Sequence, residues 1–372
     1  MGFITVLERM VNMRRTHIST ARAGYKLAKP IWTETGSILL GVGIELNDRY
    51  IDRLKQMGID YIYVEDQRTS DIIPEDVLQD ETRKKSVEAV HKTMTGLMTE
   101  AKGKKSAPVK DMGSTFRSLF TNILTELPNR GDVVVNLINL HVKDGYLFHH
   151  AVNVAVLAGV LGIAKGYNKN QLLDLGVGAL LFDVGMTVFP DNLWQSGADL
   201  TGEQRGRLQK HTEEGYHLLR KQYDVSLLSA HCALQHHERF DGSGYPRGLK
   251  GGEIHEYAQI VAIADVYDAL TSPRPYRKRY SPSEAIEFLY ASGNQWFDIE
   301  LIKLFCKYIA IYPLSSTVQL NTGQLGVVSH VDPLVAHRPI VRIIQEADGK
   351  ETTTAYEIDL RTHVNITIVQ TL

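Results

Sequence analysis

The feature that most constrains this chain is a set of histidines and aspartates embedded in apolar segments of helical periodicity. They are His150, Asp183, His211, His236, His237 and Asp265. A lone buried histidine or aspartate is usually a satisfied polar group of the core. Six such groups without partners would cost on the order of several kcal/mol in aggregate. The pattern therefore predicts a ligand that satisfies them together.

Divalent metal ions are the ligands that fit this set of residues. Imidazole nitrogens and carboxylates are accepted by iron, manganese and zinc. Residues from about 115 to 312 are almost continuously helical in pattern, broken by one polar, glycine-rich loop from Phe240 to Gly252. Side chains from different helices of a bundle can converge on a two-metal site. We therefore expect a helical domain that holds metal ions.

Composition limits the remaining possibilities. The chain has 372 residues, which corresponds to two or three domains at roughly 150 residues each. The formal charge of −2 creates no global field toward nucleic acid or anionic lipid. No apolar run was expected to reach the roughly 18 residues of a membrane span, so we expect neither a nucleic-acid polymer nor a membrane as partner. Two cysteines are too few for a disulfide framework and fit a cytoplasmic location.

Four segments are expected along the chain. Residues 1–75 are interpreted as a small α/β unit, residues 76–128 as a helical connector, residues 129–312 as the helical domain and residues 313–372 as a β-rich unit. The lysine-rich stretch 101–111 is interpreted as a solvated linker, because no aromatic platform accompanies its charges. The last segment is divided into short β-type runs by turn residues. The predicted fold class is therefore mainly α with two small additional units.

Directly after His236-His237, two strings identify a family. The chain reads HHERFDGSGYPRGLKG there and VAIADVYDALTSPRPYR further on. These strings resemble the HD-GYP family of cyclic di-GMP phosphodiesterases, within the HD superfamily, from about residue 150 to residue 286. The resemblance implies an all-helical domain with two or three metal ions. Those ions activate a water that cleaves the phosphodiester bonds of the dinucleotide.

The resemblance assigns roles position by position. It places the metal ligands on His150, Asp183, His211, His236, His237 and Asp265. Asp183 would bridge two ions and is the expected catalytic residue. Trinuclear members carry an acid where this chain has Tyr146, so at most two ions, of iron, manganese or a similar metal, are expected. Arg274 and Arg277 would contact the ligand phosphates. Tyr245 of the glycine-rich loop is also assigned to substrate binding.

Two replacements depart from the family pattern. Where the family has His-Asp-(Ile/Val)-Gly-Lys, residues 182–186 read FDVGM. Phe182 cannot coordinate a metal, and Met186 offers no charge to a phosphate. His149 is not expected to replace the lost histidine, because consecutive helical residues point about 100° apart. The ion held by Asp183 with the later histidines should therefore be better supported than the ion held by His150, Asp183 and Asp265.

Two functions stay open at this point. The first is metal-dependent hydrolysis of cyclic di-GMP to the linear dinucleotide or GMP, impaired by the two replacements. The second is a catalytically degenerate module that binds cyclic di-GMP or a protein partner and signals without turnover. Loss of a metal ligand should lower metal affinity by at least about 10- to 100-fold, which favours the second. The intact histidine pair favours the first, and a homodimer is compatible with both.

Overall fold

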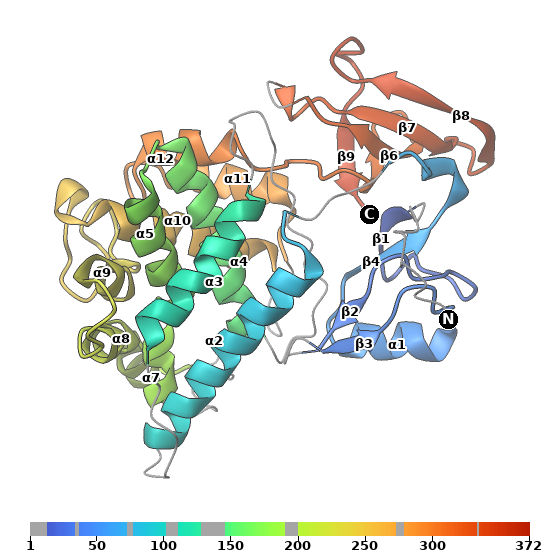
Figure 1. Ribbon diagram of the computed structural model, residues 1–372. Helices are drawn as coiled ribbons and strands as arrows, with labels where there is room; N and C mark the ends of the chain where they lie inside the picture. Colours follow the sequence, from blue (N-terminus) through green and yellow to red (C-terminus); the bar gives the residue numbers. More distant parts are fainter. Residues whose placement is uncertain are drawn as a thin grey trace.

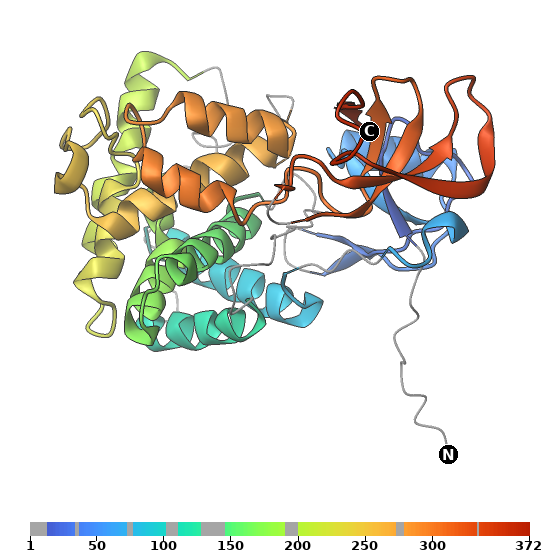
Figure 2. The same cartoon turned by 90° about the horizontal axis from the view of Figure 1, so that it is seen from above.

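The computed structural model describes residues 13–33, 37–72, 77–101, 111–127, 146–189, 200–272, 279–332 and 335–372. A helical body occupies one side of the molecule, and two small β units lie together on the other side (Figures 1 and 2). The predicted fold class, mainly α with an N-terminal α/β unit and a C-terminal β-rich unit, is confirmed. The candidate site lies within the helical body.

The N-terminal unit is built on an antiparallel strand pair. β1 (Met13–His17) pairs with β4 (Tyr61–Glu65), and β2 (Ile31–Trp32) pairs with β3 (Ile38–Leu40). Helix α1 (Asp48–Gln56) begins at Asn47, whose side chain accepts a hydrogen bond from the Tyr50 amide and so satisfies a free donor of the first turn. A short 3₁₀ turn, η1 (Gln67–Thr69), follows β4. Strand β1 was not predicted, because its charged run Arg14-Arg15 lacks the alternation that marks a half-buried strand.

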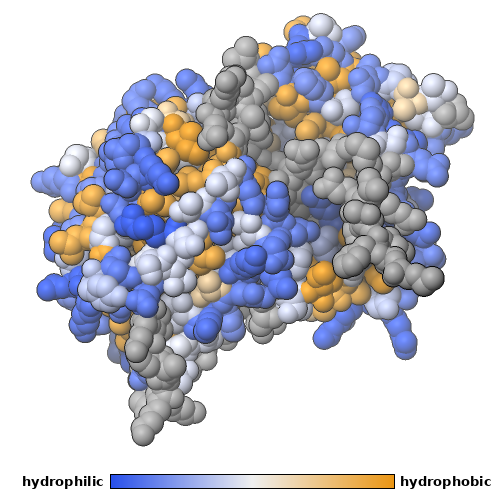
Figure 3. Space-filling model, in the orientation of Figure 1, coloured by the Kyte–Doolittle hydropathy of each residue, from blue (hydrophilic) through white to orange (hydrophobic). Residues whose placement is uncertain are grey.

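The predicted connector is part of the helical body. It forms two helices, α2 (Asp80–Ala101) and α3 (Met112–Glu126). Val87 and Met94 of α2 and Phe116 and Phe120 of α3 are fully buried in the same core as the helices that follow. Figure 3 shows a mainly hydrophilic surface over α2, as expected for a helix that buries only one face. Most of the lysine-rich stretch 101–111 lies outside the described residues.

The remaining helices pack around α4 and α10. They are α4 (Tyr146–Ala164), α5 (Lys169–Leu181), η3 (Val184–Val188), α7 (Gly202–Gln209), α8 (His211–Leu219), α9 (Leu227–Gln235), η5 (Gly251–Glu253), α10 (Glu256–Thr271), α11 (Pro282–Ala291) and α12 (Ile299–Cys306). Reciprocal capping boxes at Asn168, Thr201 and Ser281 start three of them, and each satisfies two backbone donors. These caps fix where the helices begin, and hence which residues reach the interior.

Two segments are long and apolar enough to cross a membrane, contrary to the expectation from the sequence. They are Tyr146–Ala164, which is α4, and Lys169–Val188. In this fold 89% of the first window and 72% of the second are buried inside the protein. Other helices cover α4 on all sides, so it needs no polar face. The protein interior therefore accounts for both apolar runs.

The C-terminal unit is one antiparallel sheet of five strands in the order β8-β7-β6-β5-β9. The strands are β5 (Thr317–Leu320), β6 (Leu325–His330), β7 (Ile340–Gln345), β8 (Glu351–Asp359) and β9 (Ile368–Thr371). The sheet is attached to the N-terminal unit by backbone contacts, since the Arg15 amide donates to the Ser315 carbonyl at 2.7 Å. The Ser315 hydroxyl donates to the Met13 carbonyl, also at 2.7 Å. The two ends of the chain therefore form one β-rich region.

Candidate metal centre

Three histidines converge at the ends of two helices. His211 begins α8, His236 terminates α9, and His237 follows it directly. Their ligand nitrogens all lie within 4.8 Å of one another. Asp183 Oδ1 lies 3.4 Å from His211 Nε2 and 3.6 Å from His236 Nε2. The structure therefore brings together four of the six predicted metal ligands.

Hydrogen bonds to backbone carbonyls orient two of these rings. His211 Nδ1 donates to the Leu208 carbonyl at 2.8 Å, and His236 Nδ1 donates to the Cys232 carbonyl at 3.0 Å. A carbonyl oxygen only accepts, so the proton of each neutral ring lies on Nδ1 and Nε2 keeps its lone pair. The two Nε2 atoms face each other at 3.2 Å. Two lone pairs at this distance repel, and a shared cation removes the repulsion. This donor set fits a divalent metal ion.

Burial favours the neutral imidazoles that a metal needs at His211 and His237. Burial lowers the pKa of His211, although the neighbouring Asp183 carboxylate opposes this effect. Burial and the two nearby imidazoles hold the pKa of His237 well below its usual range. Burial raises the pKa of Asp183, but the imidazoles of His236 and His211 outweigh it and lower that pKa. Neutral imidazoles beside an ionised carboxylate are the forms that bind divalent metals.

A glycine allows Asp183 to reach the histidines. Asp183 directly precedes η3, the short turn that follows α5, and Gly185 lies within that turn. A Cβ atom at Gly185 would overlap the backbone carbonyl of His211 and crowd the amide of Gly215. The missing side chain lets η3 lie against α8. The Asp-Val-Gly sequence therefore serves packing as well as ligand placement.

His150 lies in a separate buried network. Its Nδ1 is 2.6 Å from Asp268 Oδ2, and its Nε2 is 2.9 Å from Asp265 Oδ1. Burial lowers the pKa of His150, but the hydrogen bonds to the two carboxylates outweigh burial and raise it to about 9. Asn153 donates to the second oxygen of Asp268 at 3.0 Å, and Arg83 of α2 donates to Asn153 at 2.9 Å. Arg83 and Asn153 were missed by the sequence reasoning, since neither lies in a recognised motif.

Phe182 lies against both groups of ligands. Its ring is 1% exposed. Its centroid lies 5.7 Å from the ring of His150 and 5.0 Å from the ring of His236. The replaced residue thus contacts both halves of the predicted site with a group that binds no metal. Met186 packs, partly buried, against the core. His149 was expected to point elsewhere, and its Nε2 lies 3.2 Å from the Thr33 carbonyl of the N-terminal unit.

The glycine-rich loop folds back onto the histidine cluster. Tyr245 stacks on His237 with ring centroids 4.7 Å apart and planes 27° from parallel. Glu238 holds the loop by accepting from the amides of Arg247 at 2.8 Å and Leu249 at 3.0 Å. Gly244 permits this path, because a Cβ there would overlap the backbone of Arg239. Tyr245 therefore borders the cluster. The other two residues predicted to bind substrate, Arg274 and Arg277, lie outside the described residues.

Arg239 is a charged residue that the sequence reasoning missed. Its guanidinium lies 5.2 Å from the ring centroids of both Trp296 and Phe297. Its buried Nη1 has no hydrogen-bond partner among the described residues. Burial lowers its pKa, while the nearby Asp265 carboxylate raises it. An available signal was its position inside HHERFDGSGYP, two and three residues after the recognised ligands His237 and His236.

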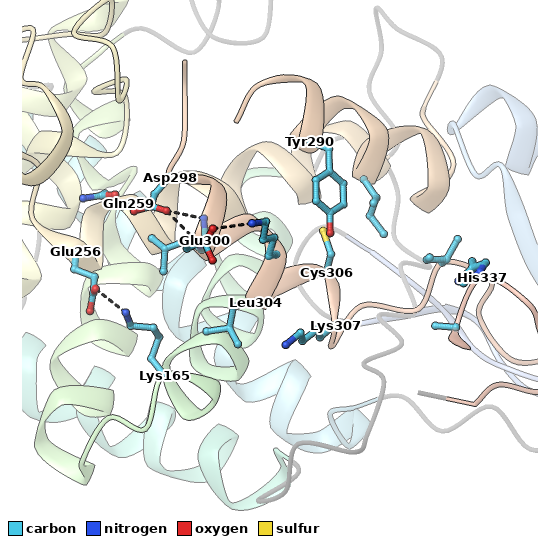
Figure 4. A pocket seen from close by; sticks show the side chains of 15 residues that line it. Lys165, Glu256, Gln259, Tyr290, Asp298, Glu300, Leu304, Cys306, Lys307 and His337 are labelled. Atoms are coloured by element: carbon cyan, nitrogen blue, oxygen red, sulfur yellow. Dashed lines mark hydrogen bonds and ion pairs between the residues drawn. The ribbon is translucent and has the colours of Figure 1, made fainter. Parts of the chain in front are cut away.

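A cavity elsewhere in the helical body contains none of the predicted site residues. It has a volume of about 660 Å³ and is lined by α10, α11, α12 and residues 336–337. Figure 4 shows that several of its charged side chains form ion pairs with one another. Lys165 pairs with Glu256 at 2.9 Å, and Lys303 pairs with Glu300 at 2.7 Å. Because these charges are already balanced, the histidine cluster is the better candidate for a metal-dependent site.

Two regions of the chain match models of known protein families. Residues 132–301 match the family model described as HD domain, and residues 317–372 match a KOW domain associated with HD domain. Residues 132–301, just under half of the chain, are therefore similar to the HD domain family. The HD-superfamily resemblance drawn from the sequence is confirmed. The four clustered ligands lie within the HD domain match, as do His150, Asp265 and Asp268.

Two curated relatives and one solved structure illustrate the similarity. The chain is 33% identical over 229 residues to a cyclic di-GMP phosphodiesterase of Pseudomonas aeruginosa, covering 62% of this chain and 55% of that protein. It is 35% identical over 160 residues to a cyclic di-GMP phosphodiesterase response regulator of Xanthomonas campestris, covering 43% and 42%. An HDG"Y"P protein from Bdellovibrio bacteriovorus aligns with a TM-score of 0.46 at 19% identity, covering 79% and 98%. The chain spans about half the length of these curated relatives.

Proposed function

We propose that this protein is a metal-dependent phosphodiesterase of the HD-GYP type whose substrate is a cyclic dinucleotide, cyclic di-GMP. The observation that carries the proposal is the pair of facing Nε2 atoms of His211 and His236, 3.2 Å apart, beside the Asp183 carboxylate. The names of both curated relatives support the reaction and the substrate. A cytoplasmic location is part of the proposal, and the described Cys232 and Cys306 are both free thiols.

The roles of the residues follow from their geometry. His211, His236, His237 and Asp183 would hold a divalent ion, which would supply Lewis-acid polarisation of a phosphoryl oxygen. Asp183 would hold its negative charge toward that ion, since its pKa is lowered. Burial raises the pKa of Tyr245, so its hydroxyl keeps its proton and can donate to a phosphate oxygen.

A second, weaker ion site would lie at His150 and Asp265. His150 Nε2 and Asp265 Oδ1 are 2.9 Å apart, and Asp268 fixes the ring through Nδ1, as supporting carboxylates do for metal-bound histidines. Phe182 provides no ligand next to this pair. The proposal therefore assigns one well-supported ion and one poorly supported ion, at most two in all. Arg274 and Arg277 are proposed to bind the phosphates of the dinucleotide.

One observation favours the alternative, a module that binds the dinucleotide without turnover. The Phe182 ring contacts both His150 and His236, so apolar surface occupies the place between the two groups of ligands. A two-metal displacement needs both ions to stabilise the entering and leaving oxygens. With one ion, binding would persist while hydrolysis slows. Such a module would signal to a protein partner or a second copy.

Metal analysis and turnover in the same sample test these proposals. We expect elemental analysis to find metal in the purified protein and added manganese or ferrous iron to support hydrolysis of cyclic di-GMP. His236→Asn should abolish both. His217→Asn is the matched control, because His217 lies exposed on α8 outside the cluster. Metal with bound but unhydrolysed dinucleotide would support the alternative. Unchanged metal content in His236→Asn would refute the assigned centre.

A further inference from the structure

Two arginines from different parts of the fold converge on one tyrosine ring. Arg15 of β1 places its guanidinium carbon 4.1 Å from the centroid of Tyr61. Arg279, which follows α10, places its guanidinium carbon 4.4 Å from the same centroid. His17 packs edge-on against this ring with centroids 5.1 Å apart. Tyr61 therefore gathers two cations and an imidazole where the N-terminal unit meets the helical body.

Neither arginine has a carboxylate partner among the described residues. Arg14, which is as buried as Arg15, is by contrast paired with Asp66 at 2.9 Å. Arg15 is only 8% exposed, yet no described side chain accepts a hydrogen bond from it. A contact with an aromatic face uses none of the five N–H donors of a guanidinium. The donors of both arginines are therefore available to an outside acceptor.

The charges of Arg15 and Arg279 also favour a bound anion. Burial lowers the pKa of Arg279 to about 10, and the nearby charge of Arg15 acts in the same direction. Asp60 and two tyrosines oppose this effect, but Asp60 forms no ion pair with either arginine. Two like charges with little water around them repel each other. A bound anion would offset both the repulsion and the lost hydration.

The pair lies where three parts of the molecule meet. The carbonyl of Arg15 accepts a hydrogen bond from the Thr317 hydroxyl of the C-terminal sheet at 2.6 Å. The residue after Arg279 is held to the metal-site helix, since the Tyr280 amide donates to the Leu270 carbonyl of α10 at 2.9 Å. Helix α10 carries Asp265 of the candidate site. A ligand held by both arginines would therefore connect the β-rich region to that helix.

We propose that Arg15 and Arg279 form a binding site for an oxyanion of the phosphoryl class, either free phosphate or the phosphate group of a nucleotide. The planar forks of two guanidinium groups match the tetrahedral oxygens of such a group. This site is separate from the metal centre and does not depend on the proposed hydrolase activity. A purely structural clamp of both arginines on Tyr61 is the competing interpretation.

Calorimetric titration of the metal-free protein with inorganic phosphate tests the proposal. EDTA removes the metal, and chloride at equal ionic strength serves as the blank. We expect saturable binding, weakened about tenfold or more by Arg15→Gln and by Arg279→Gln, because each loses charge-assisted hydrogen bonds. Arg22→Gln is the matched control, since Arg22 is exposed in the same unit. Absence of saturable binding, or an affinity in either glutamine variant equal to that of the unaltered protein, would overturn the proposal.

Additional variants distinguish loss of anion binding from a folding defect and from binding at the metal centre. Arg279→Lys keeps the charge and should retain more affinity than Arg279→Gln, whereas equal loss in both would point to a structural clamp and overturn the proposal. His236→Asn should bind phosphate as the unaltered protein does. Loss of binding in that variant alone would move the anion to the histidine cluster and refute this site. Tighter binding of 5′-GMP than of phosphate would identify a nucleotide as the source, and equal binding would identify free phosphate.

Discussion

Replacing Phe182 with histidine should lower the stability of the metal-free protein and raise its affinity for a metal ion. The ring is 1% exposed, so Phe182→His puts a polar imidazole into a site shaped for an apolar group. A buried polar group without a partner costs about 1 to 3 kcal/mol, and the lost apolar area adds about 1 kcal/mol. We therefore expect the free energy of unfolding of the metal-free variant to fall by about 2 to 4 kcal/mol.

Bound manganese should restore much of the free energy of unfolding that Phe182→His loses. The new imidazole would lie beside His150 and His236, whose rings Phe182 contacts now. A restored ligand that raises metal affinity about 10- to 100-fold adds about 1.4 to 2.7 kcal/mol of metal-linked stabilisation at the same saturating concentration.

The assay is urea denaturation with EDTA and with manganese, for the unaltered protein, Phe182→His and Phe182→Leu. The leucine variant is the matched control, because it also loses the ring but gains no metal ligand. Manganese should stabilise Phe182→His more than either of the others. If manganese stabilises all three proteins equally, position 182 does not face a metal site, and the reasoning from its two ring contacts is wrong.

Three further predictions concern the support of the site and the N-terminal unit. Gly185→Ala should lower the free energy of unfolding by about 1 to 3 kcal/mol, since its Cβ would overlap the His211 carbonyl; an unchanged urea midpoint would contradict the close packing. Arg83→Met should cost about 1 to 3 kcal/mol by removing the buried hydrogen bond that Arg83 donates to Asn153 Oδ1, and a double-mutant cycle with Asn153→Leu should show coupling instead of additivity. Asp66→Asn should cost about 1 to 3 kcal/mol at pH 7. Burial raises the pKa of Asp66, but hydrogen bonds from Arg68 outweigh burial and lower it. The stabilisation by the Asp66 carboxylate is therefore present above about pH 4 and is lost as pH falls through the lowered pKa. A difference in unfolding free energy between Asp66→Asn and the unaltered protein that stays constant down to pH 2 would refute this prediction.

Much of the helical domain and its ligand set could be predicted from local sequence. Apolar residues at helical spacing indicate helices because such a face must be buried. The string HHERFDGSGYP places two histidines and a glycine-rich loop next to each other, so their proximity is dictated by the chain itself. Tyr245 and His237 are in contact for this reason. The mainly α fold class and the proximity of His236, His237 and Tyr245 followed from these local signals.

Other features depended on how distant segments pack. Helices α2 and α3 were interpreted as a connector, because their many charges hide the face that joins the core. The sequence alone did not show that His150 lies between Asp265 and Asp268, or that Phe182 contacts both groups of ligands. Arg15 and Arg279 lie far apart in the sequence, in the N-terminal unit and the helical domain.

The amino-acid sequence by itself determined the helical domain, the histidine and aspartate side chains available to a metal, and the absence of a histidine at position 182. Tertiary structure alone decided which ligands share a cluster, what supports them and where unpaired charges meet. The physical reason is the distance along the chain over which each interaction acts. Periodicity, caps and turns act over a few residues, whereas hydrogen bonds and ring contacts between distant segments exist only after packing has brought those segments within a few ångströms.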